Sequence, residues 1–270
     1  MSAEASSIGA LPASRRLDGV MRRVTAGATL PVGFILTCLG ILEILARTLA
    51  VPEVLFPSPG RVLTALVINA PALCYHAALT VSQVAIALVV SLAVGVAVAA
   101  VFTLSRVIND MFAPLFVVLQ IIPKIALAPL FVVWFGPGAM SHLSFAVCLS
   151  FFPILAGARA GFEETSADAV RLCSALRASR WQTLIHVQLP MALPQLFVGA
   201  KVSTTLCIIG VVLGEFVSAK AGIGWYIVQA AALSRTANIL AALLVLSLFG
   251  LLIYGVVAAG EIMVRRRMFG

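Results

Sequence analysis

Long apolar runs are the feature of this sequence that most limits its possible folds. About 20 consecutive apolar residues suffice for a helix to cross the roughly 30 Å hydrocarbon core of a bilayer. In lipid, backbone amide and carbonyl groups find no water, so each run must satisfy its own hydrogen bonds as a helix. The chain is 62% hydrophobic and only 10% charged. We therefore predict an all-α, polytopic membrane protein with six transmembrane helices, at residues 30–50, 79–105, 111–135, 139–158, 194–217 and 237–264.

The first run follows several arginines and so imitates the start of a secretory signal peptide. Its apolar stretch is longer than a signal-peptide core, and no small-x-small cleavage site follows it. We therefore predict that residues 30–50 remain as the first transmembrane helix. Glu43 in its interior is costly in lipid, so its side chain should face protein or extend toward an edge of the membrane.

The basic residues predict the orientation of the chain. Arginines are frequent before the first run, between the fourth and fifth runs and after the last, and they are rare in the other loops. Because Lys and Arg collect on the cytoplasmic side, we predict a cytoplasmic segment at residues 1–29, a transmembrane domain at 30–264 and a cytoplasmic basic tail at 265–270. Attraction to anionic membrane lipids also accounts for the net charge of +8, without nucleic-acid binding.

No pattern in the sequence indicates an enzyme. The five cysteines form no CxxC pair, and the three histidines lack the spacing of metal ligands. Phosphate-binding loops of the GxxxxGK[ST] type, GxSxG elbows and HExxH helices are also missing from the sequence. We predict no catalytic residue, no metal site and no cofactor held by this chain.

Two runs carry small residues at helical spacing. Ser91, Gly95 and Ala99 recur every four residues, and Gly210 with Gly214 forms a GxxxG pattern. Such faces allow close approach of two helices, within one chain or between two chains. The third run, in contrast, contains three prolines, so we expect it to be kinked or broken.

Charged side chains inside the apolar runs are candidates for a translocation pathway. Lys124 lies beside Pro123 in the third run, and Lys201 and Glu215 lie in the fifth. A buried charge in a membrane faces a partner, a cavity or a substrate path. For Lys124 the alternative is a structural role, with the ammonium group bound by carbonyls freed at the kink or by a carboxylate.

Two loops between the runs predict short helices. Ser58 can cap a helix that starts at Pro59, continues to about Ala70 and is ended by Pro71. The loop at residues 219–227, AKAGIGWYI, indicates a turn followed by an amphipathic segment whose aromatic side chains suit the headgroup level.

The polar, Arg-rich loop at residues 161–190 is the longest interruption between runs. Thr165 with Asp168 predicts the start of one short helix, and Ser179 with Gln182 predicts a capping box for a second. We expect the second helix to continue to about residue 187 and to stop near Pro190. No membrane span requires such a loop, so it indicates a partner-binding site; a solvated connector is the alternative.

Four segments, in this order, carry a resemblance to a known family: FPSP at residues 56–59, IPKIALAPLFVVWFGPG at 122–138, ASRWQTLIHVQLP at 178–190 and GEFVSAKAGIGWYI at 214–227. Together they resemble the permeases of ABC importers, in the nitrate, sulfonate and taurine branch of the binding-protein-dependent transport family. The likeness covers the chain from about residue 55 to its C-terminus.

The resemblance implies a type I importer permease in the bacterial inner membrane. Two permease subunits would form the pathway, and we expect two copies of this chain rather than two different chains. Two ATPase subunits, which hold ATP and Mg²⁺, would dock on the cytoplasmic loops, and a periplasmic solute-binding protein would deliver a small solute. That solute would be an anion or a vitamin precursor.

The resemblance also makes residues 161–190 the coupling loop that contacts the ATPase. The family's signature there is Glu-Ala-Ala, three residues, Gly, nine residues, Ile, one residue, Leu-Pro. This chain keeps the spacing and the final Leu-Pro but replaces the other signature residues. The residues implied in ATPase contact are Glu164, Asp168, Arg171, Leu172, Cys173, Arg177, Ala178, Ser179, Arg180, Trp181, Val187, Leu189 and Pro190.

Two of these replacements have physical consequences. Arg177 occupies the Gly place, which costs about 1 kcal/mol if the backbone there is left-handed. Arg171 occupies the Glu place and reverses the charge offered to the ATPase, so we expect an acidic residue opposite it. An ion-coupled secondary transporter and a membrane scaffold protein are the alternatives. A secondary transporter would use midmembrane carboxylates and inverted repeats; Glu43 and Glu215 are carboxylates within the runs, but no clear internal repeat is visible.

Overall fold

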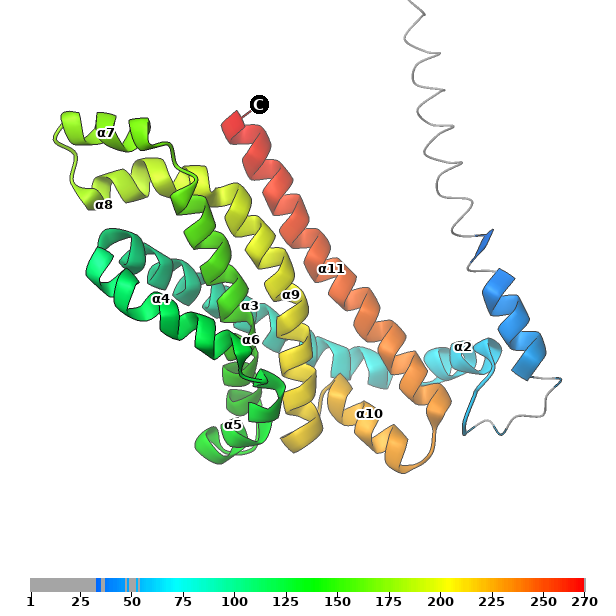
Figure 1. Ribbon diagram of the computed structural model, residues 1–270. Helices are drawn as coiled ribbons and strands as arrows, with labels where there is room; N and C mark the ends of the chain where they lie inside the picture. Colours follow the sequence, from blue (N-terminus) through cyan, green and yellow to red (C-terminus); the bar gives the residue numbers. More distant parts are fainter. Residues whose placement is uncertain (1–32, 35–36, 47, 49–51, 53, 270) are drawn as a thin grey trace, which may run out of the picture.

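The computed structural model describes residues 33–34, 37–46, 48, 52 and 54–269. This part of the chain is helical and contains no strand, which confirms the predicted all-α class (Figure 1). The predicted cytoplasmic segment 1–29 lies outside the described residues. The predicted first span, 30–50, is described only in part, as the short helix Thr37–Ala46.

Within the described residues, four helices are long and apolar enough to cross a membrane. A fifth span results if Arg106–Ile121 and Lys124–Phe135 count as one broken span, bent by 86°. Six spans were predicted, and the described residues confirm four of them, or five if the broken span is included. The four long helices are Ala70–Leu104 (α3), Ala139–Glu163 (α6), the continuous Arg180–Ser218 and Thr236–Met268 within α11 (Thr236–Phe269).

The predicted break in the third run is confirmed. Helix α4 (Arg106–Ile121) ends before Pro123, and a short 3₁₀ turn, η1 (Lys124–Leu127), leads into α5 (Ala128–Phe135). Pro123 has no amide to donate, so the helix hydrogen bonds cannot continue through it. Pro129 is tolerated because it lies in the first turn of α5, where amides have no helical partner.

The predicted helix after Ser58 forms as α2 (Pro59–Ile68), but two details of the prediction are wrong. The Ser58 side chain makes no capping hydrogen bond; the amide of Gly60 instead donates to Oε2 of Glu43, at 2.8 Å. Glu43 therefore faces protein, as expected. Pro71 does not end the helix, because it lies in the first turn of α3, a position at which proline costs no hydrogen bond.

Close packing of α6 against the long helix α9 (Leu189–Ser218) forms the centre of the bundle. A Cβ atom on Gly210 would lie 2.6 Å from the backbone of Ala146, and one on Gly95 would lie 2.6 Å from Ile154. The small faces predicted from the sequence thus bring helices together within one chain. Between α3 and α6, the hydroxyls of Ser91 and Ser150 are 2.6 Å apart.

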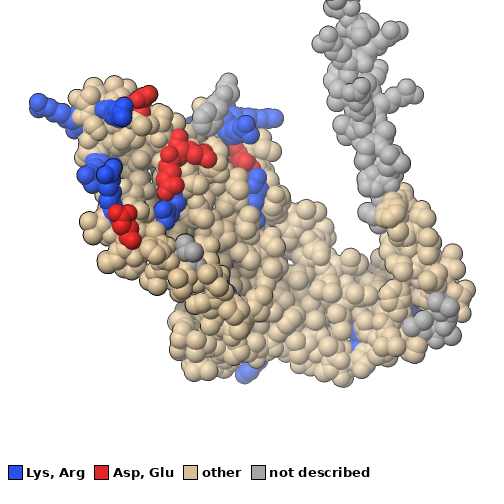
Figure 2. Space-filling view, in the orientation of Figure 1, with Lys and Arg blue, Asp and Glu red and all other residues tan. Residues whose placement is uncertain are grey.

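Charged side chains gather at one end of the molecule. In Figure 2 they lie over the end that holds α7 (Ala167–Ala175), α8 (Arg180–Thr183) and the end of α11, while most of the remaining visible surface is uncharged. Helix α10 (Ile223–Ala232) lies at the opposite end of α9 (Figure 1). This separation is typical of a protein whose middle is covered by lipid.

Candidate functional site: the coupling loop and the charges within the helices

The first helix of the coupling loop, α7, starts one residue later than predicted. Ser166 is its N-cap, and its hydroxyl accepts a hydrogen bond from the amide of Ala169 at 3.2 Å. Thr165, which we had expected as the cap, is buried, so its position is set by packing. Asp168 lies in the first turn and pairs with Arg171 at 3.7 Å, but both side chains are highly exposed and the pair contributes little.

The bend between the two helices lies at Arg177, as predicted. Its φ angle is 59°, so the backbone of this residue is left-handed, the conformation in which an arginine is strained. The amide of Ala178 donates to the carbonyl of Cys173 at 2.9 Å, and that of Arg177 donates to Ser174 at 3.0 Å. These two bonds form a Schellman motif, in which a non-glycine residue costs about 1 kcal/mol.

The capping box of the second helix is confirmed. The amide of Gln182 donates to the Ser179 hydroxyl at 3.2 Å, and the Ser179 amide donates to the Gln182 side chain at 2.8 Å. The predicted stop near Pro190 is wrong. Helix α8 continues through a π-helical turn, η2 (Leu184–Gln188), directly into α9. Pro190 has no amide to donate to the preceding turn. The π turn shifts the hydrogen-bond register at this point, and the helix therefore continues beyond Pro190.

The coupling loop exposes large apolar side chains at the charged end of the molecule. Leu172 is 62% exposed, Leu176 75% and Trp181 57%. Exposed apolar groups of this size, rimmed by arginines, are typical of a surface that a partner covers. Of the other predicted contact residues, Glu164, Asp168, Arg171, Arg177, Ser179 and Arg180 are exposed, and Cys173, Ala178, Val187, Leu189 and Pro190 are half-buried.

Contacts with the bundle hold the coupling loop in place. The guanidinium of Arg180 donates to the carbonyl of Leu104 at the end of α3, at 3.2 Å. The side chain of Gln195 donates to Glu164 at 2.6 Å. Leu184 is 3% exposed and packs in the core formed by α3, α6 and α9. Sequence reasoning missed Leu184, although an apolar residue one turn after Arg180 was a signal for a face turned to the bundle.

Lys124 lies at the break of the third run, where it has both a hydrogen-bond partner freed by the break and a hollow beside it. Its ammonium donates to the carbonyl of Gln120 at 3.0 Å, a group freed by the break, and lies 4.8 Å from the ring centre of Phe152. The same side chain lines a hollow of about 430 Å³ together with Leu149 and Leu206. An ammonium has three donors, so these contacts leave capacity for another acceptor.

The other two intramembrane charges have partners within the chain. Lys201 on α9 forms an ion pair with Glu261 on α11, with a separation of 2.7 Å. Glu215 is 1% exposed and accepts hydrogen bonds from the Thr80 hydroxyl at 2.8 Å and the Gly224 amide at 2.7 Å. A carboxylate enclosed in this way does not face a route for solute. The structure therefore gives Glu215 a place in the packing of the chain.

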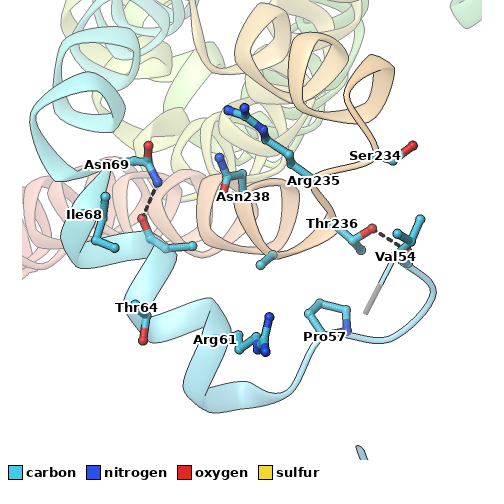
Figure 3. A pocket seen from close by; sticks show the side chains of 12 residues that line it. Val54, Pro57, Arg61, Thr64, Ile68, Asn69, Ser234, Arg235, Thr236 and Asn238 are labelled. Atoms are coloured by element: carbon cyan, nitrogen blue, oxygen red, sulfur yellow. Dashed lines mark hydrogen bonds between the residues drawn. The ribbon is translucent and has the colours of Figure 1, made fainter. Parts of the chain in front are cut away.

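A second hollow, of about 580 Å³, lies between α2 and the turn from α10 to α11 (Figure 3). Arg61 and Arg235 line it, and the hydroxyl of Thr236 donates to the carbonyl of Val54 across its rim. In the residues that the structure describes, no three His, Cys, Asp or Glu side chains are grouped as a metal ion would require.

These features together define an all-helical membrane protein with an ordered loop suited to a partner. Residues 91–268 match the family described as the binding-protein-dependent transport system inner membrane component. The chain therefore belongs to this family of ABC importer permeases.

Curated relatives agree with this assignment. The chain is 31% identical to a probable ABC transporter permease of Haemophilus influenzae over 214 residues, 79% of this chain and 87% of the relative. It is 30% identical to the formylaminopyrimidine transport permease of Halalkalibacterium halodurans over 223 residues, covering 82% and 89% of the two chains. It is 26% identical to the taurine transport permease of Escherichia coli over 232 residues, covering 83% and 84%.

Proposed function

We propose that two copies of this permease form the translocation pathway of an ATP-driven importer in a bacterial inner membrane, with both termini in the cytoplasm. The coupling loop docks on an ATPase subunit, which holds ATP and Mg²⁺. Residues 30–50 and the broken helix α4 to α5 each contribute one span, which completes a six-helix, type I arrangement. The family match favours this function over an ion-coupled secondary transporter or a membrane scaffold.

One observation carries the proposed docking. The coupling loop exposes Leu172, Leu176 and Trp181 on two capped helices at the charged end of the molecule. Exposed tryptophan and leucine side chains on an ordered loop gain hydrophobic free energy when a groove of a partner covers them. Because α8 continues into α9, movement of this loop also moves a long helix of the bundle.

The proposed solute is small and carries a negative charge. Support comes from the hollow beside Lys124, where an ammonium with unused donor capacity lies near an aromatic ring and an open volume of about 430 Å³. The two relatives named for their solutes carry formylaminopyrimidine and taurine, which differ in chemistry. A periplasmic solute-binding protein then makes the choice of solute, and it docks at the end that holds α2, α10, Arg61 and Arg235.

Copurification with the ATPase tests the proposed function. The chain is coexpressed with its ATPase and binding protein, and complex yield, ATP hydrolysis and uptake are measured in proteoliposomes. Trp181→Ala should lower complex yield or uncouple hydrolysis from uptake, and deletion of residues 171–177 should abolish uptake. Trp134→Ala is the matched control, because Trp134 is also exposed, at 62%, but belongs to α5. Uptake and solute-stimulated hydrolysis that both survive the deletion contradict the proposal.

A further inference from the structure

The first turn of α10 is capped by side chains of two other helices. The amide of Gly222 donates to His76 Nδ1 at 3.1 Å, that of Ile223 to the Thr80 hydroxyl at 2.9 Å and that of Gly224 to Glu215 Oε2 at 2.7 Å; His76 and Thr80 belong to α3 and Glu215 to α9. These amides have no partner inside their own helix. We call this set of groups the clasp.

The clasp leaves no space for other side chains. A Cβ atom on Gly222 or Gly224 would overlap the Glu215 side chain, and one on Gly224 would also lie 2.7 Å from the carbonyl of Val212. Gly222 has a φ angle of 117°, which only glycine adopts readily. Thr80 joins both halves of the clasp, since its hydroxyl donates to Glu215 and accepts from Ile223. The N-terminus of α10 is thus fitted to α3 and α9 as one unit.

A second polar contact fixes the same end of the bundle. His142 of α6 lies 3.0 Å from the hydroxyl of Ser218 at the end of α9, and 3.3 Å from the side chain of Gln83 on α3. Gly214 packs against this histidine, where a Cβ atom would approach its backbone to 2.9 Å. Three helices and α10 are therefore held together around Glu215.

The clasp lies at the far end of the helix that begins in the coupling loop. The continuous helix Arg180–Ser218 has 39 residues, which corresponds to about 58 Å at 1.5 Å per residue. Figure 1 shows α8 at one end of the bundle and α10 at the other, with α9 running between them. The π turn and Pro194 are points at which a helix can bend, but the backbone is continuous from Arg180 to Glu215, so a displacement at Arg180 reaches Glu215 when α3 and α10 hold that end.

We propose that Glu215 is a positioning residue for energy coupling, which joins the coupling-loop helix to α10 and α3. This inference rests on the proposed function, because the displacement originates where the coupling loop meets the ATPase. The clasp then carries the displacement to the end opposite that loop, where α10 moves together with α3 and α9. In the reverse direction, a binding protein that contacts this end signals to the ATPase through the same helix.

The test uses the assembled complex with its ATPase and binding protein in proteoliposomes. Thr80→Val and Glu215→Gln weaken the clasp, Thr80→Ser keeps the hydroxyl, and Ser82→Ala is a control because the Ser82 hydroxyl donates only to Leu79 of its own helix. For both weakened variants we expect about tenfold lower stimulation of hydrolysis by the loaded binding protein, with basal hydrolysis and complex yield changed less than about twofold. Thr80→Ser and Ser82→Ala should behave like the unchanged chain.

Two results would overturn the proposal. Full stimulation in both weakened variants shows that the clasp carries no signal. An equal fall of yield, basal hydrolysis and stimulated hydrolysis shows a purely structural role. These results differ from a failure of the proposed function, in which the unchanged chain does not copurify with the ATPase at all.

A second measurement leaves the clasp intact and does not depend on how the variants fold. Spin labels on Tyr75 of α3 and Leu233 after α10, both exposed, report the distance between the two elements in a chain whose native cysteines are replaced. The distance should be the same with and without ATP, because the clasp moves as one unit. A change on ATP binding would overturn the proposal.

Discussion

Lys201 and Glu261 form an ion pair that joins α9 to α11, with 2.7 Å between the ammonium and the carboxylate. Both side chains are less than one quarter exposed, so removal of one partner leaves the other charge poorly solvated. We expect Lys201→Met to lower the free energy of unfolding by about 1 kcal/mol, since the pair is partly screened. Thermal denaturation in detergent measures this change. The double variant Lys201→Met with Glu261→Leu should recover most of it, and an equal or greater loss in the double variant contradicts the explanation.

Arg177→Gly should stabilise the coupling loop. Arg177 holds a φ angle of 59° at the end of α7, and glycine adopts that conformation without the clash of a Cβ atom. We expect a gain of about 1 kcal/mol in the free energy of unfolding, measured by hydrogen exchange of the α7 amides. Ser234→Gly is a matched control, because Ser234 has a φ angle of 55° after α10 and should stabilise that helix only. Unchanged exchange at α7 would sink this account of the strain.

Arg171→Glu should weaken docking on the native ATPase. Arg171 is exposed at the place where the family signature has Glu, so the native ATPase should present an acidic residue to it. The added carboxylate would meet like charge, with a dissociation constant about two- to fivefold higher at low salt and a smaller effect at high salt. Asp168→Asn is the control for the exposed ion pair with Arg171. A tighter complex from Arg171→Glu refutes the compensating acidic residue.

Lys124→Met should reduce uptake while the complex still assembles. The ammonium beside the hollow is the group that would attract an anionic solute, and methionine retains most of the side-chain volume without the charge. We expect a fall in uptake of about tenfold, with partial retention in Lys124→Arg. Uptake and complex yield are measured in parallel. If complex yield falls with uptake in proportion, the role of Lys124 is structural, through its bond to Gln120.

The sequence predicted the helices well because lipid leaves the backbone no alternative. It predicted the capping box at Ser179 and the bend at Arg177, since both depend on residues close together in the chain. Proline misled the prediction twice. Pro71 and Pro190 were expected to end helices. Pro71 instead lies in the first turn of α3, and Pro190 lies inside the continuous helix Arg180–Ser218, directly after a π turn; short-range sequence does not distinguish these roles.

Long-range partners were beyond the reach of sequence patterns. Glu215 and Thr80 are 135 positions apart in the chain, and only the packing of α3 against α9 brings them together. For the same reason Glu261 was not recognised as the partner of Lys201. The pattern Thr165 with Asp168 predicted Thr165 as a helix cap, but Ser166 is the N-cap and Thr165 is buried, which local sequence does not indicate.

Site-specific photo-crosslinking from position 181 tests the central claim most directly. A benzophenone amino acid replaces Trp181, and the control carries it at Trp134, which is similarly exposed but belongs to α5. We predict an adduct with the ATPase subunit from position 181 and none from position 134. Absence of an ATPase adduct at position 181 in an active complex, or equal adducts from both positions, would contradict the assignment of residues 161–190 as the coupling loop.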